Sequence, residues 1–544
     1  MNSSMVSTRG SSNARAIPVV ILGIGIVFLI SVFLFNSGPS ASLFPTPRQL
    51  VFALIPIAIL SVAIWKPSWA SSCFIALIFW LPGPVDHLFD VQFSFYASVD
   101  KARTISLLDL FFLLATAIML TRHPIKYRKL TWWLILGLLL ALALHILIGS
   151  LWFFSILPAI RLPALLTSIM GLRLLLVYLW VSRSFETISS LRRFYVGVAI
   201  GLMGLLANTL FVSLLGGNES GRIAAGTFGN NSFSVLLAVM CVLVVQFFFA
   251  LRHLTWRIGL FFVGTAALAA MILTGTRMAL VVFTMGIALT YLCSQNRFNG
   301  KKVVRTVLYA LILLVLSLVG MRLFLNADVS NPSLARFQSS ISALLGQGSS
   351  STNAYVLFST LSARGVIWDA ALNMVEQSPW FGIGAGQWNF ERMFTGIFHV
   401  VMPSGNPYTL TDPHNGYIHI VTEFGYPAVA IYVIIVVLGL VSGARNVLLT
   451  RKQEHAGVME SQYKFLVSGL FAAMSMFVLA EMTNSYIMKI HFQYFYGIII
   501  FSQFRIGALL RQMPTRILTP GLSKSPIIKS AVRTSDIKDA MPPL

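Results

Sequence analysis

Long apolar segments recur along the chain, and they constrain the fold more than any other feature of the sequence. A helix needs about 20 mainly apolar residues to cross a bilayer. Fourteen segments approach or reach that length: 17–36, 49–65, 69–82, 104–121, 131–152, 164–182, 194–215, 231–251, 258–275, 278–294, 304–325, 416–441, 465–483 and 490–508. Because 69–82 is short, 49–82 could instead be a hairpin or one span with a re-entrant piece. The sequence predicts an all-α polytopic integral membrane protein with about 12–14 spans.

The composition excludes a water-soluble enzyme, since 57% of the residues are hydrophobic, only 10% are charged and the mean hydropathy is +0.81. The net charge of +22 does not indicate nucleic-acid binding, because the basic residues separate apolar segments and form no single patch. Cys73, Cys241 and Cys293 all lie in apolar segments, and their spacing matches no disulfide framework or zinc site. We expect them to pack in the bundle.

The basic residues predict the orientation of the spans, since short cytoplasmic loops carry the excess of Lys and Arg. With the N-terminus inside, 27 of the 39 basic residues fall inside and 11 fall outside, with Arg173 left in mid-span. The first apolar segment, which follows Arg9 and Arg15, resembles a signal-anchor. Both termini are therefore predicted to be cytoplasmic.

Five regions follow from this division. They are a cytoplasmic N-terminus (1–16), a bundle of about eleven spans (17–325), one large outer loop (326–415), the C-terminal spans (416–508) and a basic, disordered cytoplasmic tail near anionic lipid (509–544). Part of the outer loop, 362–415, has an ordered pattern. Arg364, Trp368, Ala371, Leu372 and Val375 follow helical spacing, and Pro379 ends it. The loop is therefore expected to contain short helices.

Three arginines lie on the predicted outer side, against the general charge trend. Arg222 precedes span 231–251, Arg277 occupies the tight turn before span 278–294, and Arg364 begins the loop helix. Guanidinium groups can donate two parallel hydrogen bonds to phosphate oxygens, so the three are candidates for binding a phosphorylated ligand. The alternative for each one is an interfacial residue whose stem lies along apolar surface.

His414 is the strongest single candidate for chemistry. Asp412 is a suitable helix N-cap and Pro413 a suitable first residue, so His414 is expected in the first turn of the next span. The positive helix terminus should keep the imidazole neutral, as a general base requires. The alternative is a capping or water-facing histidine. Glu423 should lie too deep to meet His414 and is expected to pair with another span.

Several other chemistries are excluded by missing patterns. The glycine run at 382–387 lacks the third glycine and the surrounding strands of a dinucleotide site, although it could let the backbone approach a sugar or phosphate. No Asp-x-Asp pair occurs, so no divalent-metal site for a sugar nucleotide is predicted. Serine-nucleophile and zinc motifs are also absent.

These motifs together resemble the O-antigen ligase and polymerase superfamily, which includes exopolysaccharide polymerases. The resemblance lies in Arg364-Gly-Val-Ile-Trp368-Asp-Ala-Ala371-Leu, Pro379-Trp-Phe-Gly382-Ile-Gly384, Pro413-His414-Asn415-Gly416-Tyr417 and Glu423-Phe-Gly425. Arg222 with Asn231, Thr-Gly-Thr-Arg277 and Gly171-Leu-Arg173 look like its weaker upstream motifs. The resemblance covers roughly residues 165–430.

The resemblance implies a metal-independent, inverting glycosyltransferase without a cofactor, in the bacterial cytoplasmic (inner) membrane. The donor would be an undecaprenyl-diphosphate-linked glycan, and the acceptor would be lipid A–core or a second lipid-linked glycan. Carried over residue by residue, His414 is the catalytic candidate and Arg222, Arg277 and Arg364 would bind the donor diphosphate. Asp412, Asn415 and Glu423 would support the site, and Arg173 would be structural.

Ligase and polymerase are separated by one weak feature. The lipopolysaccharide-type polymerases often carry glycine eleven positions after a key arginine, whereas this chain has Phe233, Ala288 and Val375 at the three such positions. The departure favours a ligase or an exopolysaccharide-type enzyme. A lipid-linked glycan transporter is the alternative from another class, but it should show charges along a central cavity and repeated halves.

Overall fold

The computed structural model describes most of a helical bundle. The described residues are 67–80, 130–156, 161–214, 230–274, 276–294, 371–384, 399–401, 407–409, 413–488 and 490–513, with a few more near 112–117, 304 and 364–369. The predicted spans 17–36 and 49–65, most of 104–121 and nearly all of 304–325 lie outside them. So do the predicted N-terminal segment 1–16 and the tail beyond residue 513.

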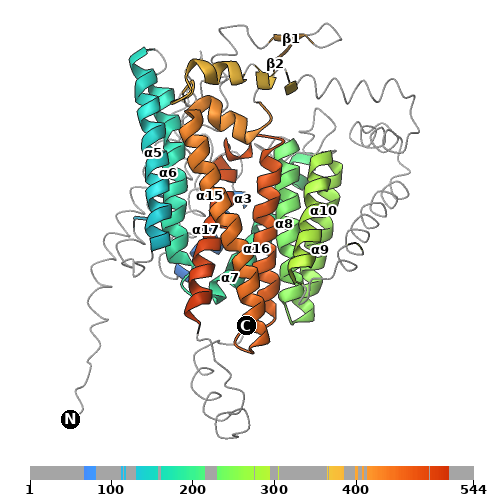
Figure 1. Cartoon of the computed structure of the whole chain (residues 1–544). Helices are drawn as coiled ribbons and strands as arrows, with labels where there is room; N and C mark the ends of the chain where they lie inside the picture. Colours follow the sequence, from blue (N-terminus) through green and yellow to red (C-terminus); the bar gives the residue numbers. More distant parts are fainter. Residues whose placement is uncertain are drawn as a thin grey trace, which may run out of the picture.

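Long helices running roughly along one axis make up the described structure (Figure 1). They are α3 (Pro67–Trp80), α5 (Leu130–Ile156), α6 (Arg161–Ser184), α7 (Ser189–Leu214), α8 (Asn230–Ala250), α9 (Leu254–Leu273), α10 (Arg277–Ser294), α15 (Gly416–His455), α16 (Gln462–Glu481) and α17 (Ile490–Gln512). A short 3-10 helix, η4 (Tyr486–Met488), links the last two. Among the described residues, α5, α7, α8, α9, α15 and α16 are long and apolar enough to cross a membrane. The predicted all-α membrane bundle is confirmed.

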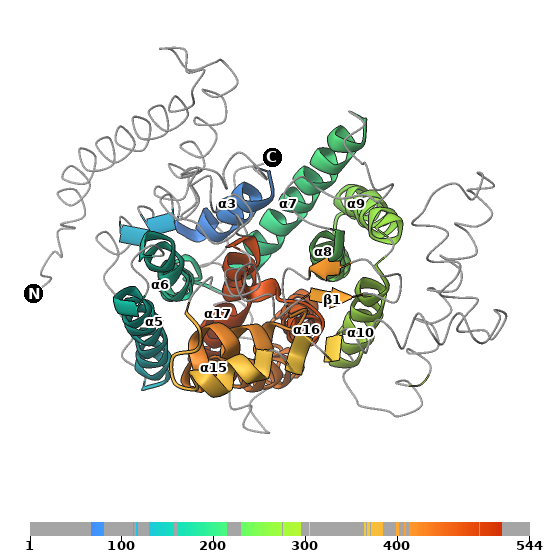
Figure 2. The ribbon, with the colours of Figure 1, turned by 90° about the horizontal axis from the view of Figure 1, so that it is seen from above.

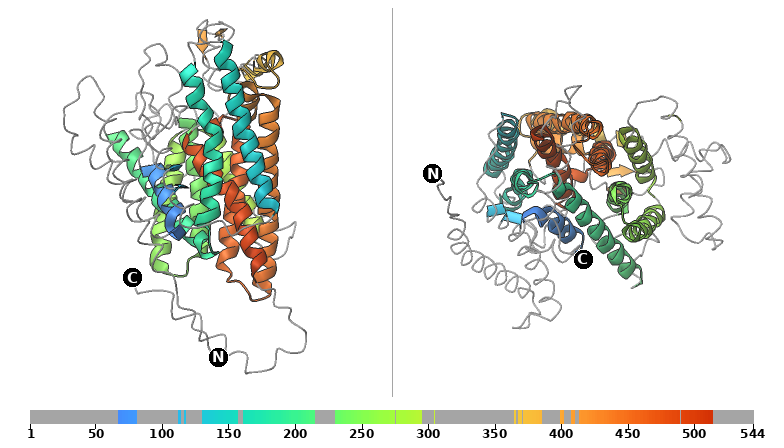
Figure 3. Two further views of the ribbon diagram at one scale, coloured as in Figure 1. Left: turned by 90° about the vertical axis from the view of Figure 1, so that its left-hand side faces the viewer. Right: turned by 90° about the horizontal axis from the view of Figure 1, so that it is seen from below.

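One short ribbon interrupts the helical pattern. Strand β1 (His399–Val401) pairs antiparallel with β2 (Pro407–Thr409), and Val400 lies opposite Tyr408. The ribbon lies at one end of the bundle (Figures 1 and 3). The sequence predicted short helices in this loop but not the ribbon, because three-residue strands leave no periodicity to read.

The helices differ in how much of their surface faces other helices. Residues along α8 such as Phe233 and Leu243 are fully buried, whereas Trp256, Phe261 and Phe262 of α9 are largely exposed. Viewed from above, α17 lies between α6 and α15, and α9 lies at the edge of the bundle (Figure 2). Large exposed apolar side chains at the edge are expected where lipid is the solvent.

Basic and amide side chains bind the C-terminal carbonyls of neighbouring helices at one end of the bundle, here called the basic end. Arg451 donates to Leu292 O at 2.8 Å and to Cys293 O at the end of α10. Arg505 Nε donates to Phe185 O, just after α6, at 2.6 Å. Gln453 Nε2 donates to Leu510 O near the end of α17, also at 2.6 Å. These side chains satisfy carbonyls that a helix end leaves without partners.

Spans 416–441 and 490–508 begin where expected but end later, whereas the helix of span 465–483 begins three residues earlier, at Gln462. Span 416–441 is part of a helix that continues to His455, and span 490–508 continues to Gln512. The sequence boundaries followed the apolar composition. The helices continue into polar sequence because Arg451 and Gln453 bond to the ends of neighbouring helices.

The basic end is expected to face the cytoplasm, because short cytoplasmic loops are rich in Lys and Arg. Single cysteines in a background with the three native cysteines replaced by serine can test this. In right-side-out vesicles, Trp380→Cys at the opposite end should react with a membrane-impermeant maleimide. Glu460→Cys, exposed at the basic end, should react only after permeabilisation. The reverse labelling pattern would contradict the orientation.

Candidate active site

His414 lies immediately before α15, not inside its first turn. The helix begins at Gly416, and its N-cap is Asn415, whose side-chain oxygen accepts hydrogen bonds from Tyr417 N at 3.0 Å and Ile418 N at 3.2 Å. The prediction that Asp412 caps this helix and places His414 within it is therefore wrong. Asn415 can cap because its own backbone is extended, with φ −155° and ψ 116°.

The backbone of His414 has a φ of 51°, in the left-handed region. It is the one non-glycine residue with positive φ among the described residues. Histidine, like Asn and Asp, is enriched among the few residues that adopt this conformation, which costs about 1–2 kcal/mol for most side chains. This turn brings the chain into the helix and leaves the half-buried imidazole just outside the helix N-terminus.

The segment that carries Arg364 is helical, as its spacing predicted, at 364–365, 367–369 and 371–377; it is called the Arg364 helix below. Its buried side chains are Ile367, Ala371, Met374 and Val375. The first three of these form a small cluster with Ile383, and Ile418 of α15 packs against it. Leu372, which follows the same helical spacing, is 44% exposed.

A hydrogen bond ties the Arg364 helix to the residue before His414. Trp368 Nε1 donates to Pro413 O at 2.9 Å. Trp368 follows Arg364 by one helical turn, so this bond brings the arginine's helix to the turn that holds His414. The structure therefore places these two site candidates in one local unit.

Of the other two candidate arginines, Arg277 lies within the described residues and Arg222 does not. Arg277 is the first residue of α10, whose opposite end bonds to Arg451 at the basic end, so Arg277 lies at the same end of the bundle as His414. Arg222 and Asp412 lie outside the described residues. The helix that follows Arg222, α8, also begins at the His414 end, since Arg252 just beyond its C-terminus pairs with Glu460 at 3.2 Å.

The helix α15 is broken at Gly425, whose φ of 78° and ψ of 177° are not helical. In an unbroken helix the carbonyls of Thr422 and Glu423 would accept from residues 426 and 427. Residue 427 is proline and has no N–H, and Tyr426 N donates instead to Pro379 O at 2.9 Å. The break thus leaves carbonyls that need donors from elsewhere.

The loop Pro379–Gly384 supplies those donors; it is called the clasp loop below. Ile383 N donates to Thr422 O at 2.8 Å, and Gly384 N donates to Glu423 O at 3.0 Å. The next carbonyl along, Phe424 O, lies 2.8 Å from Nε2 of His145 in α5. The carbonyls of Thr422 and Glu423 would otherwise be unpaired in a low-dielectric interior, at a cost of several kcal/mol each.

Two glycines make this close approach sterically feasible. A β-carbon on Gly382 would overlap the backbone of Glu423 and Phe424, and one on Gly425 would overlap the carbonyl of Trp380. Both glycines also have positive φ. The sequence suggested that the glycine run lets backbone approach a sugar or phosphate; at Gly382 the partner that approaches is α15 itself.

Glu423 is fully buried and pairs within its own helix. Its Oε1 lies 3.1 Å from Nε2 of His419, one turn earlier, and both side chains are at most 1% exposed. The expectation that Glu423 would pair with another span is not met by this contact. Residues four positions apart lie on the same face of a helix, so these two side chains meet without a second span.

Two further polar residues lie inside the bundle. Arg173, expected to be structural, is 1% exposed and donates to Gln493 Oε1 of α17 at 3.1 Å. Glu481, at the end of α16, is equally buried, and its carboxylate lies directly against Gly416 at the start of α15. Glu481 could not be selected from the sequence. It lies 65 positions after Gly416, and the two residues meet only because their helices pack together.

No group of three or more potential metal-ligating side chains occurs within the part of the chain that the structure describes. The site candidates within these residues carry nitrogen groups, the guanidinium groups of Arg364 and Arg277 and the imidazole of His414. Guanidinium groups of this kind suit phosphate oxygens.

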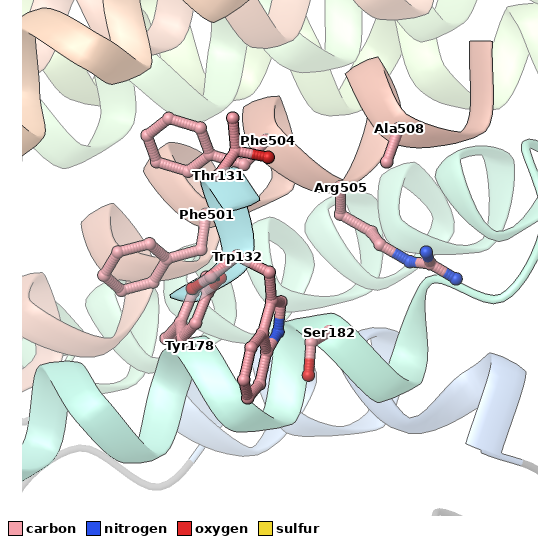
Figure 4. Close-up of a pocket in the computed structure, with 8 residues that line it drawn as sticks. All are labelled: Thr131, Trp132, Tyr178, Ser182, Phe501, Phe504, Arg505 and Ala508. Atoms are coloured by element: carbon pink, nitrogen blue, oxygen red, sulfur yellow. Dashed lines mark hydrogen bonds between the residues drawn. The ribbon is translucent and has the colours of Figure 1, made fainter. Parts of the chain in front are cut away.

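A separate pocket lies toward the basic end, between α5, α6 and α17 (Figure 4). Its walls are mainly aromatic: Trp132, Tyr178, Phe501 and Phe504. The guanidinium of Arg505 extends away from these rings, and its Nε donates to Phe185 O. Because this pocket lies remote from His414, it is not part of the candidate active site.

A known protein family matches the part of the chain that carries most of the sequence motifs. Residues 260–433 match the family model described as O-antigen ligase. This segment belongs to the O-antigen ligase superfamily. It includes Arg277, the Arg364 helix, the clasp loop and His414, but not Arg222. Among curated proteins, none matches the chain.

The sequence analysis missed one residue at this junction, His145. It lies before the region of resemblance, and a single histidine on an otherwise apolar helix is most often a packing residue. Its position in the sequence held one usable signal, since it is a polar residue within a predicted span and such residues are often functional.

Gly425→Ala should destabilise the protein by at least about 2 kcal/mol, because alanine strongly disfavours this backbone conformation and its β-carbon would overlap Trp380 O. Gly137→Ala in α5 is the matched control, since a β-carbon there meets nothing within 4 Å. That control should be neutral or slightly stabilising. Thermal unfolding of both variants in detergent measures the difference, and equal midpoints would contradict the clasp geometry.

Proposed function

We propose that this protein is a membrane glycosyltransferase of the O-antigen ligase type. It transfers a glycan from an undecaprenyl-diphosphate-linked donor to a sugar hydroxyl at the outer face of the bacterial cytoplasmic membrane. The observation that carries the proposal is the match of residues 260–433 to the O-antigen ligase family. That segment contains His414 and two of the three candidate arginines.

The arrangement of the candidates supports this activity. Arg277, Arg364 and His414 come from three separate segments of the chain, and all three segments reach the end of the bundle opposite the basic end. By the charge rule that end faces outward, where a lipid-linked donor with its glycan in the aqueous phase would be accessible.

In the proposed reaction, His414 accepts the proton of an acceptor hydroxyl as that oxygen attacks the anomeric carbon of the donor glycan. The new glycosidic bond forms as the bond from the anomeric carbon to the diphosphate oxygen breaks, and the diphosphate leaves with the electron pair. A single displacement of this kind inverts the anomeric configuration. A general base of this type contributes about 10²–10⁴-fold to the rate.

The arginines are proposed to bind the donor diphosphate and to stabilise the charge that develops on the leaving group. Arg277 begins α10, so the positive end of that helix adds to its charge. Arg364 is held by the Arg364 helix, and Arg222 is the third candidate. Fixed guanidinium groups can replace a divalent cation when they lie within hydrogen-bond reach of the oxygens.

The supporting residues are assigned different roles from those expected. Asn415 caps α15 beneath His414, and Glu423 belongs to the buried pair with His419. Asp412 is retained as an orienting group. The departure from the polymerase glycine pattern favours a ligase or an exopolysaccharide-type enzyme. A ligase would act on lipid A–core, and a polymerase would act on a second lipid-linked glycan.

His414→Asn should reduce glycan transfer at least about 10²-fold, because the amide cannot take up a proton. Asparagine also adopts the left-handed conformation readily, so folding should be preserved. Transfer of labelled glycan by purified protein, normalised to protein amount, measures the effect. His253→Asn, at an exposed histidine near the basic end, is the control and should leave transfer unchanged. Near-normal transfer by His414→Asn would remove the general-base assignment.

Transfer should persist in excess chelator, and Arg277→Lys should lower it at least about tenfold, because an ammonium group cannot supply two parallel hydrogen bonds. The assay contains donor, acceptor and chelator, and the products are measured by mass spectrometry. A strict requirement for added Mg²⁺ or Mn²⁺ would contradict the arginine mechanism. Movement of donor across the bilayer without a new glycosidic bond would identify a transporter instead.

A further inference from the structure

We propose that His145 of α5 is a positioning residue for His414, acting through the broken end of α15. The inference rests on the proposed transferase function and extends it to a helix outside the matched family region. His145 is not placed near the reacting atoms. It holds the short helical segment at whose N-terminus His414 lies.

The contact of His145 with α15 has a defined donor. Its Nε2 lies 2.8 Å from the carbonyl oxygen of Phe424, and a carbonyl can only accept a hydrogen bond. Nε2 must therefore carry the proton. The imidazole also stacks on Phe381 of the clasp loop, with ring centres 5.2 Å apart and planes inclined by 20°. One side chain thus contacts both α15 and the clasp loop.

The packing around His145 matches this role. Gly149, one turn further along α5, lies in ordinary contact with Phe381, and Ser150 and Ile146 border the same small crevice as Glu423 and Phe424. The other face of α5, with Leu144 and Leu147, is exposed toward the bundle exterior. His145 therefore belongs to the one face of α5 that meets α15.

The break at Gly425 makes the outer part of α15, residues 416–424, a separate helical piece. Its connection to the rest of the helix lacks the bonds of an unbroken helix, and its inner end is held by two loop amides and by His145. The two loop bonds come from backbone N–H groups, which substitutions other than proline leave in place. The bond from His145 is the side-chain contact that substitution can test.

A small rotation of this piece would displace His414 appreciably. From Phe424 to Gly416 the segment is about 12 Å long, so a pivot of about 5° at Gly425 moves its outer end by about 1 Å. A misplacement of about 1 Å can reduce a catalysed rate about 10²-fold. Loss of the Phe424 contact should therefore lower turnover more than it lowers substrate binding.

Two amide substitutions provide a matched test. In His145→Gln the side-chain nitrogen reaches roughly as far as Nε2 and can donate to Phe424 O. In His145→Asn the amide is equally polar but one methylene shorter, so it falls short of that carbonyl. The two variants differ in the length of the side chain alone, because both remove the titratable ring and its stacking on Phe381. His253→Asn serves again as the control.

We expect His145→Asn to lower kcat at least about tenfold with KM for donor and acceptor unchanged, and His145→Gln to stay within about threefold of the native rate. Rates are measured on full-length protein in membranes and normalised to inserted protein. The pH dependence of kcat in His145→Gln should match that of the native protein, since the proton acceptor remains His414.

Each other outcome is decisive. Native-like kcat in His145→Asn, or equal losses in both variants, would overturn the positioning role. Loss of the native pH dependence in His145→Gln would indicate that His145 itself transfers protons and would also overturn it. If the native protein forms no glycosidic bond, the proposed function fails. Native transfer with unaffected His145 variants would contradict the inference alone.

Discussion

Backbone hydrogen bonding at the break in α15 is the constraint on which the rest of the candidate site depends. Inside a bilayer, a helix can be interrupted only where neighbours supply the bonds that the interruption removes. Here Gly425 and Pro427 release carbonyls, and the clasp loop and His145 bond to them. This requirement fixes the position of the clasp loop against both α15 and α5, and with it the end of the Arg364 helix.

The position of His414 follows from the same arrangement. The clasp loop continues directly from the Arg364 helix, whose Trp368 bonds to Pro413. The short outer piece of α15 is thus held at its inner end by the clasp and next to its outer end by Trp368. His414 occupies the turn between these supports in a left-handed conformation that the N-cap of Asn415 helps to fix. A strained, well-supported residue of this kind is typical of functional sites.

Arginine serves different purposes at the two ends of the bundle. At the basic end, Arg451 and Arg505 bond to the C-terminal carbonyls of α10 and α6, so these charged side chains complete neighbouring helices. At the His414 end, Arg277 lies at the N-terminus of α10. The helix dipole already places partial positive charge there, so it does not stabilise the charge of the guanidinium group. That unfavourable placement is the physical reason for assigning Arg277 to an anionic ligand.

Many of the described helices could be predicted from the apolar segments of the sequence. Apolar run length predicted the starts of α8, α10, α15 and α17 to within a residue, because lipid solvates only segments whose side chains are apolar. The reason for glycine at two motif positions becomes clear only from contacts in the folded protein. Gly382 and Gly425 are required by contact between segments 43 residues apart. His145 joins the site only because α5 packs on α15, and such long-range contacts leave no periodic signal in the chain.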